Sequence, residues 1–268
     1  MNLRGKIFTP ALLAVAGIAV ILPPFVSRGF DISNILQINV FLLVHSIRGQ
    51  FQEAFPYFNF LSLVLFFCLL ASGRLFGRVF SLFAGFLYLL GGILQNLSVS
   101  DQYGFAVCTS TLVLTLLTAC SWFWGFLVRK DDFQRASVIR ILFLAPPALL
   151  ALWWPVNPSS TLPDFNLCYF LASGSSLTFC MLTTVSLAAL LIYFPHVNLL
   201  SLRVTSLCGL LIGIGNLWLE FLSLPELFWI GVLHIPLVVL SGIGVFLSFG
   251  KSLRMGRDAC GAEGSITG

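Results

Sequence analysis

The chain has 268 residues, of which 58% are hydrophobic and only 9% charged, and its mean hydropathy is +1.00. Soluble domains carry about 25% charged residues, so this composition argues against a soluble protein and predicts an all-α, polytopic membrane protein. The net charge of +4 comes from Lys and Arg residues that form no basic cluster. We therefore expect the lipid bilayer, and no nucleic acid, as a partner.

The first apolar run covers residues 7–26 and follows Arg4 and Lys6. A signal peptide has this charge pattern, but cleavage after the small residues at 14–16 would leave too short an apolar region. We predict a first transmembrane helix that ends at Pro23 and Pro24.

Further apolar runs follow, each long enough to cross a hydrocarbon core of about 30 Å. They cover residues 55–72, 79–97, 105–128, 138–154, 167–194, 199–222 and 227–249. The sequence thus predicts a bundle of about eight transmembrane helices in a single domain, residues 1–258. We expect the short, Gly-rich tail, residues 259–268, to be disordered.

Positive charge predicts the orientation, because cytoplasmic loops carry the excess of Lys and Arg. With the N-terminus inside, the inside segments hold 12 of these residues, and the outside holds only Arg28 and Arg48. Residues 31–47 would invert every later loop if they formed a ninth span. We predict that they form an external helix at the interface or capping the bundle, with Asp31 or Ser33 as N-cap. The expected protein is a multi-pass protein of the cytoplasmic membrane with both termini in the cytoplasm.

An offset of 125 residues aligns residues 78–97 with residues 203–222, with 6 of 20 positions identical and Gln95 opposite Glu220. Four spans followed by four predict two parallel four-helix repeats. The other interpretation is convergent composition, because helix packing in membranes selects small residues at such spacings.

Small and polar residues follow one face of the predicted helix at 199–222. They are Arg203, Ser206, Gly209, Gly213, Asn216 and Glu220, at the three-and-four spacing of a helix. A carboxylate that faces lipid costs a few kcal/mol. We therefore expect this face to meet protein.

Glu220 is the only acid within a predicted span, and Asn216 lies one turn below it. His234 enters the last span on the same side of the membrane, and Gln95 is on the aligned helix. We predict that Glu220, Asn216, His234 and Gln95 form a ligand- or ion-binding site. The alternative is structural: Glu220 would reach the lipid headgroups, and His234 would pack against a neighbouring hydroxyl.

Cofactor motifs are missing from the sequence. The seven cysteines contain no C-x-x-C pair, and the three histidines are too scattered for the paired ligands of a two-haem cytochrome. No phosphate-binding loop or dinucleotide fingerprint is present. We predict no metal and no cofactor.

Three functions fit these features. The first is a transporter-like or ligand-binding protein for a small molecule or ion, and the second is a non-catalytic subunit or assembly factor that binds partner helices or a second copy. The third is a membrane enzyme. Residues 119–121, Ala-Cys-Ser, resemble a fragment of the exosortase-type transpeptidase motif, although Trp122 stands where that family has Gly. Residues 171–174 resemble the Ser motif of rhomboid proteases, although Leu171 replaces the leading Gly. These resemblances imply Cys120 or Ser173 as nucleophile.

Overall fold

The computed structural model describes residues 3–128, 133, 134 and 136–263. Its helices are α1 (Leu3–Ile21), α2 (Ile35–Val44), α3 (Phe55–Ala71), α4 (Gly73–Asn96), α5 (Thr109–Val128), α6 (Val138–Trp153), α7 (Tyr169–Ala172), α8 (Phe179–Tyr193), α9 (Leu199–Trp218) and α10 (Phe228–Glu263). Short 3₁₀ helices are η1 (Ile32–Asn34), η2 (Ile47–Ala54), η3 (Ser175–Leu177) and η5 (Pro225–Leu227), and η4 (Leu219–Ser223) is a π-helical turn. Strands β1 (Phe25–Val26), β2 (Leu97–Ser100) and β3 (Gly104–Val107) form an antiparallel sheet in the order β1-β3-β2. The predicted all-helical class is confirmed apart from this small sheet.

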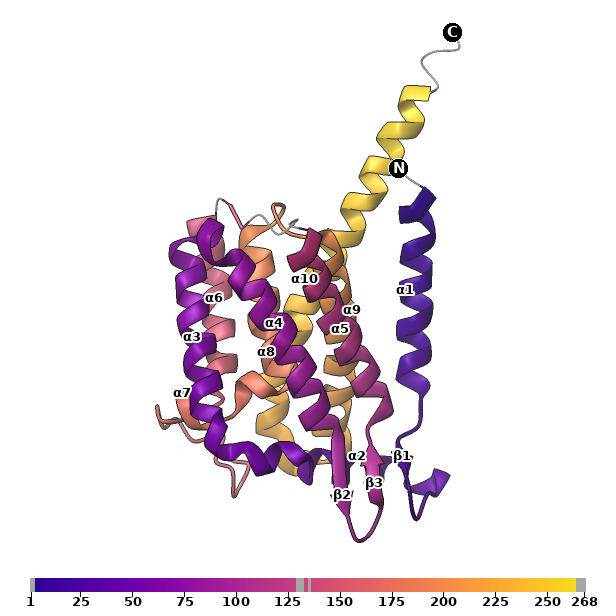
Figure 1. The fold of residues 1–268 in the computed structure, drawn as a ribbon, viewed down its shortest axis with the longest axis vertical. Coiled ribbons are helices and arrows are strands. Elements are labelled where there is room, and N and C mark those ends of the chain that lie inside the picture. Colours follow the sequence, from indigo (N-terminus) through magenta and orange to yellow (C-terminus); the bar gives the residue numbers. More distant parts are fainter. Residues whose placement is uncertain (1–2, 129–132, 135, 264–268) are drawn as a thin grey trace.

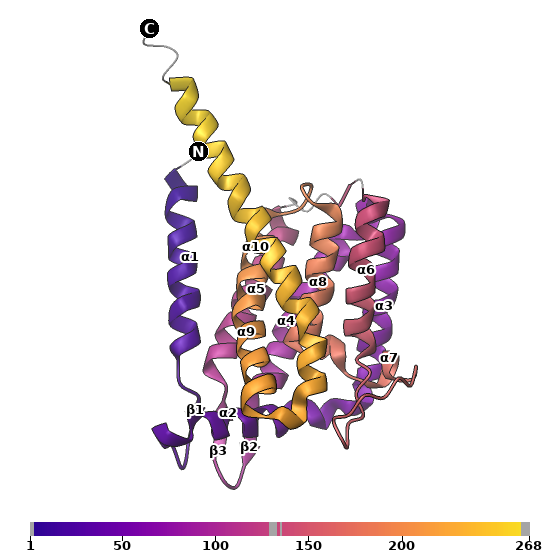
Figure 2. The ribbon, with the colours of Figure 1, turned by 180° about the vertical axis from the view of Figure 1, so that it is seen from behind.

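The long helices stand side by side, and the sheet lies at one end of them together with α2 and α7 (Figure 1). We call this the sheet end. The start of α1 and the end of α10 lie toward the opposite end, and α1 stands at the edge of the bundle in both views (Figure 2).

Within the described residues, five helical segments are long and apolar enough to cross a membrane. They are Ile32–Ala71, Gly73–Asn96, Thr109–Val128, Leu199–Ser223 and Pro225–Gly250. The bent pair Tyr169–Leu177 and Phe179–Tyr193 makes a sixth if it counts as one span, whereas the apolar part of α1 and the whole of α6 are shorter. These helices are compatible with a multi-pass membrane protein. The count of eight spans and the two repeats stay predictions.

Two predicted boundaries differ from the structure. The runs at 79–97 and 105–128 were expected to be helical throughout, but Leu97 and residues 105–107 belong to strands. A tight turn with Gly104 at a φ of 65° joins β2 to β3, and hydropathy alone does not separate a buried strand from the end of a helix. At the C-terminus, α10 continues to Glu263, so residues 259–263 are helical although we expected them in the disordered tail. Adding residues to a helix that already exists avoids the unfavourable step of helix nucleation. Residues 264–268 of that tail lie outside the described part.

The segment from α2 to η2 lies across the sheet end of the bundle before α3 turns along it (Figure 1). The Asp31 carboxylate caps η1 by accepting the Ser33 N–H at 2.9 Å, and this hydrogen bond lowers the pKa of Asp31 below its ordinary value. Ile38 and Leu42 of α2 are buried. The segment therefore covers part of the interior.

The predicted span at 167–194 is broken. The axis bends by 92° between the α7–η3 segment and α8, and Gly174 adopts a φ of 65° at the break. The buried Asn59 of α3 supplies hydrogen bonds there: its Nδ2 donates to the Leu171 carbonyl at 3.2 Å, and its Oδ1 accepts the Ser176 N–H at 3.0 Å. A break inside a membrane is tolerated only where its backbone groups find such partners.

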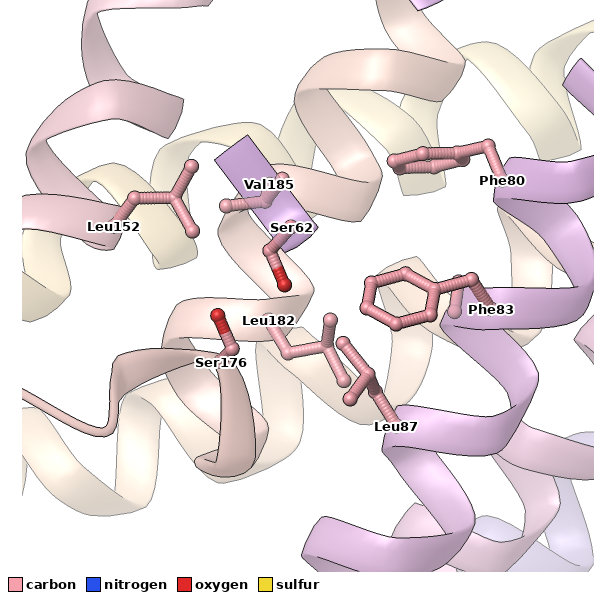
Figure 3. A pocket seen from close by; sticks show the side chains of 9 residues that line it. Ser62, Phe80, Phe83, Leu87, Leu152, Ser176, Leu182 and Val185 are labelled. Atoms are coloured by element: carbon pink, nitrogen blue, oxygen red, sulfur yellow. The ribbon is translucent and has the colours of Figure 1, made fainter. Parts of the chain in front are cut away.

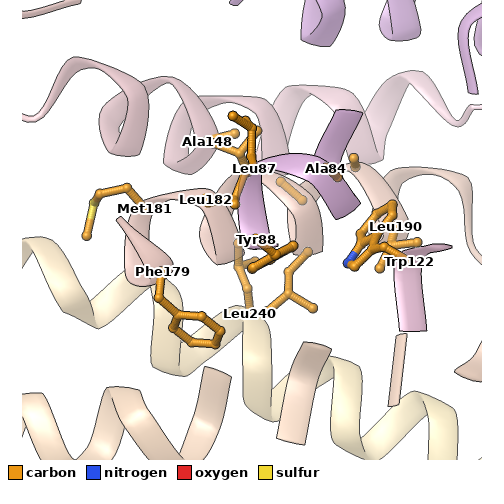
Figure 4. Close-up of a cluster of buried hydrophobic side chains, with 14 of the residues drawn as sticks. Ala84, Leu87, Tyr88, Trp122, Ala148, Phe179, Met181, Leu182, Leu190 and Leu240 are labelled. Carbon is orange, nitrogen blue, oxygen red and sulfur yellow. The ribbon is translucent and has the colours of Figure 1, made fainter. Parts of the chain in front are cut away.

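Helix α8 is the centre of the core, because all of its residues, Phe179–Tyr193, are buried. Figure 4 shows Tyr88 of α4 and Trp122 of α5 among the large side chains around it. The Tyr88 hydroxyl donates to Thr183 at 3.1 Å, and the Trp122 indole donates to Thr205 at 3.0 Å. Aromatic bulk and buried hydroxyls thus fix how α4, α5, α8 and α9 pack.

The polar face of α9 serves packing over much of its length. A Cβ atom on Gly213 would lie 2.8 Å from Cγ2 of Val238 on α10, so the two helices approach closely only because this residue is glycine. Arg203 donates two hydrogen bonds to the Ser248 carbonyl. Asn216 and Glu220, at the sheet end of α9, have different surroundings.

Candidate functional site

All four predicted site residues line one cavity of about 460 Å³ at the sheet end of the bundle. Gln95 comes from α4, Asn216 from α9, Glu220 from η4 and His234 from α10. The remaining walls come chiefly from α2, η2, the start of α5, the broken segment before α8, and α8 itself. A cavity of 300–1,000 Å³ is typical of small-molecule sites.

Glu220 and His234 form a buried pair in this wall. Each exposes only 5% of its surface, and His234 Nδ1 lies 2.8 Å from Glu220 Oε2. Nδ1 also lies 3.1 Å from the Ile230 carbonyl. A carbonyl oxygen only accepts, so Nδ1 carries a proton and donates toward both this carbonyl and Glu220 Oε2.

Asn216 holds the other side of the imidazole. Its Nδ2 lies 3.3 Å from His234 Nε2 and donates to the Cys180 sulfur at 3.1 Å. The amide therefore holds the Nε2 side of the ring, and the Glu220 carboxyl group holds the Nδ1 side. The Trp154 ring meets the imidazole edge to face, with 5.7 Å between their centroids.

The contacts of Glu220 and His234 differ from those that the two structural alternatives would give. Glu220 is buried against His234 and does not extend to the surface, and the described partners of His234 are a carboxylate, an amide and a carbonyl, with no hydroxyl among them. The π-helical turn at residues 219–223 carries Glu220 at the point where α9 ends. Such turns occur often at functional sites.

Gln95 has a structural contact as well as a place in the cavity wall. Its Oε1 accepts the N–H of Phe179, the first residue of α8, at 2.8 Å. This bond caps the helix that follows the break. Gln95 makes no described hydrogen bond to Glu220, Asn216 or His234.

Sequence reasoning missed Arg48 and Trp154, which line the same cavity. Arg48 was counted only as an outside charge, although it is half-buried and its guanidinium lies 5.7 Å from the centre of the Phe55 ring. Trp154 is the C-cap of α6 and has a left-handed backbone with a φ of 49°, as residues at helix ends commonly do. An arginine beside an interrupted apolar helix was the available signal for Arg48.

Backbone irregularities meet at this cavity. Ser173, Ser175 and Thr178 of the broken segment line it, and so does Leu219 of the π-turn. In transporters, broken helices bring backbone groups to a central binding site.

The enzyme candidates lack a base in the described part of the chain. The Ser173 hydroxyl lies near Asn59 and donates to the Leu152 carbonyl, and no histidine is within hydrogen-bonding distance. Cys120 is exposed and makes no described hydrogen bond. Neither residue shows the nucleophile-and-base geometry of a protease or transpeptidase.

A second, much smaller cavity of about 10 Å³ lies deeper in the bundle. Figure 3 shows the Ser62 and Ser176 hydroxyls directed into it among apolar side chains. This volume suffices for about one water molecule. A third pocket of about 400 Å³ lies near the loop between α3 and α4, but it contains none of the four predicted residues. The 460 Å³ cavity is the candidate ligand site because all four line it.

The larger cavity offers hydrogen bonds and charge but no evident metal centre. Among the described residues, no three His, Cys, Asp or Glu side chains lie close enough to hold a metal ion. Its chemistry is that of a carboxylate, an imidazole, a guanidinium and amides beside aromatic walls. No protein-family model, curated protein or solved structure matches this chain.

Proposed function

We propose that this chain is a transporter-like or ligand-binding membrane protein whose site is the cavity at the sheet end. The observation that carries the proposal is the Glu220–His234 pair, buried in the wall of a cavity large enough for a small molecule. An ionisable pair inside apolar helices is expensive, and in membrane proteins such groups mark substrate and ion pathways. In this proposal Glu220 holds the charge, and Asn216, Gln95 and His234 supply hydrogen bonds.

The proposal includes a topology. Eight spans, formed by α1, α3, α4, α5, α6, the α7–α8 segment, α9 and α10, cross the cytoplasmic membrane with both termini inside. The sheet end then faces outward, and the cavity lies in the outer half of the bilayer. The distribution of Lys and Arg along the sequence supports this orientation.

The test uses Glu220→Gln, which keeps the shape of the side chain and removes its charge. We expect the purified wild-type protein to be stabilised against heat by at least one member of a library of small polar molecules, and the variant to lose that stabilisation. In proteoliposomes the variant should lose uptake of the same compound by at least about tenfold, as expected for the loss of a buried charged hydrogen bond.

Glu226→Gln is the matched control, because Glu226 lies six residues away, is exposed and does not line the cavity. It should bind and transport like the wild type. Normal uptake by a correctly inserted Glu220→Gln variant would contradict the proposal.

A further inference from the structure

Two opposite charges line the cavity without meeting. Arg48 reaches it from η2, and Glu220 from the π-turn after α9. Among the described residues, the only ion pair with an N···O distance within 4.0 Å is that of Glu220 and His234. The guanidinium and the carboxylate are therefore more than 4.0 Å apart.

Each charge also keeps unused hydrogen-bonding capacity. Glu220 Oε2 accepts the imidazole N–H, whereas Oε1 has no partner in the described part of the chain. The guanidinium of Arg48 has five N–H donors, and its only described contact is the face of the Phe55 ring. Charged groups held away from bulk water gain strongly from a partner of opposite sign.

We propose that the cavity takes a zwitterionic ligand, with its ammonium group at Glu220 and its carboxylate or phosphate group at Arg48. This inference rests on the proposed function and names its substrate class. An anion without a cationic group would be repelled by the Glu220 carboxylate. A cation without an anionic group would be repelled by the Arg48 guanidinium. A molecule with both groups satisfies both charges.

The cavity wall suits the rest of such a ligand. The Gln95 Nε2 amide has no described hydrogen-bond partner, so it can donate to the ligand. Trp154, Met181 and Ile212 provide apolar surface. Two sources carry the required chemistry: a free zwitterion, such as an α-amino acid, and the headgroup of an aminophospholipid.

The test measures heat stabilisation and equilibrium binding with the full chain in detergent and in nanodiscs. One arm uses the twenty standard L-amino acids and phosphoethanolamine. The other compares nanodiscs of phosphatidylethanolamine with nanodiscs of phosphatidylglycerol, which lacks the ammonium group. Binding in either arm supports the inference and identifies the source.

Truncated probes test the two charges without any substitution in the protein. For the tightest amino acid, these are its deaminated acid and its decarboxylated amine. For phosphoethanolamine, they are ethyl phosphate and ethanolamine. Each truncated probe should bind about 10- to 100-fold more weakly than the intact zwitterion, because it leaves one charge unpaired. Equal binding of a truncated probe would overturn the inference.

Variants of the protein complete the test. Arg48→Gln should weaken zwitterion binding by about 10- to 100-fold, and Arg48→Lys, which keeps the charge, should weaken it less. Arg28→Gln is the matched control, because Arg28 is exposed, precedes α2 and does not line the cavity. If a ligand requires Glu220 for binding but not Arg48, the inference of a zwitterionic ligand is wrong, whereas the proposed function is still supported. A cavity that binds no compound of any charge class would overturn both.

Discussion

The Glu220–His234 pair has few hydrogen-bond partners of its own. His234 donates to Glu220, and Asn216 supports the other ring nitrogen. Removing one member of a buried charged pair costs more than removing both, because the remaining charge has no partner. The pair can therefore be tested through stability as well as through binding.

We predict that His234→Phe lowers the free energy of unfolding by about 3–5 kcal/mol, since it leaves the Glu220 carboxylate buried without its donor. The double variant Glu220→Gln, His234→Phe should recover more than half of that loss. Denaturation of the detergent-solubilised protein with increasing SDS, followed by circular dichroism, measures both. If the loss of unfolding free energy in the double variant equals the sum of the losses in the two single variants, Glu220 and His234 do not interact energetically.

Much of this site could be predicted from the sequence, because helical spacing placed Asn216 and Glu220 on one face and a short turn returned the chain to His234. The contact between Glu220 and His234 depends on a π-turn, which has no sequence signal of comparable strength. Arg48 was missed for another reason. A charge outside the apolar runs indicates topology, and only the path of α2 and η2 across the bundle brings it to the cavity.

Among the elements, the broken span before α8 contributes Ser173, Ser175 and Thr178 to the cavity wall. Its turn-like sequence, Ser-Gly-Ser-Ser at residues 173–176, lies within an otherwise apolar run. The sequence thus contained a local signal for the break, but not the identity of the side chain that satisfies it. That side chain, Asn59, lies more than a hundred residues earlier in the chain.

We predict that Asn59→Leu destabilises the protein by about 2–5 kcal/mol, because the Leu171 carbonyl and the Ser176 N–H lose their partner. Asn96→Leu is the matched control: Asn96 is equally buried, at 1% exposure, but its Nδ2 donates only to Gly92 of its own helix. That variant should stay within about 1 kcal/mol of the wild type. SDS titration measures both, and equal losses would show that Asn59 does not support the break.

The small sheet could not be predicted from the sequence, for a different reason. Residues 104–107 continue directly into the apolar run of α5, so hydropathy places them in one span. Strand pairing with residues 97–100 and 25–26 is a contact between distant segments. Periodicity within one segment cannot reveal such pairing.

For the whole molecule, composition alone predicted the class, and the five or six long apolar helices found among the described residues agree with it. The number of spans is harder to predict, because α1 and α6 have apolar segments shorter than the usual length of a span. The internal repeat also stays a prediction. Gln95 and Glu220, which the repeat aligns, do line the same cavity.

The orientation can be tested with a cysteine already present. Cys168 is exposed at the start of α7 at the sheet end, so the proposed topology places its thiol in water outside the cell. A membrane-impermeant maleimide should label it in intact spheroplasts, and Cys168→Ser should remove that labelling. Cys120 is also exposed but lies in apolar α5, where lipid disfavours the reactive thiolate. Labelling of Cys168 only after lysis would reverse the orientation and place the cavity toward the cytoplasm.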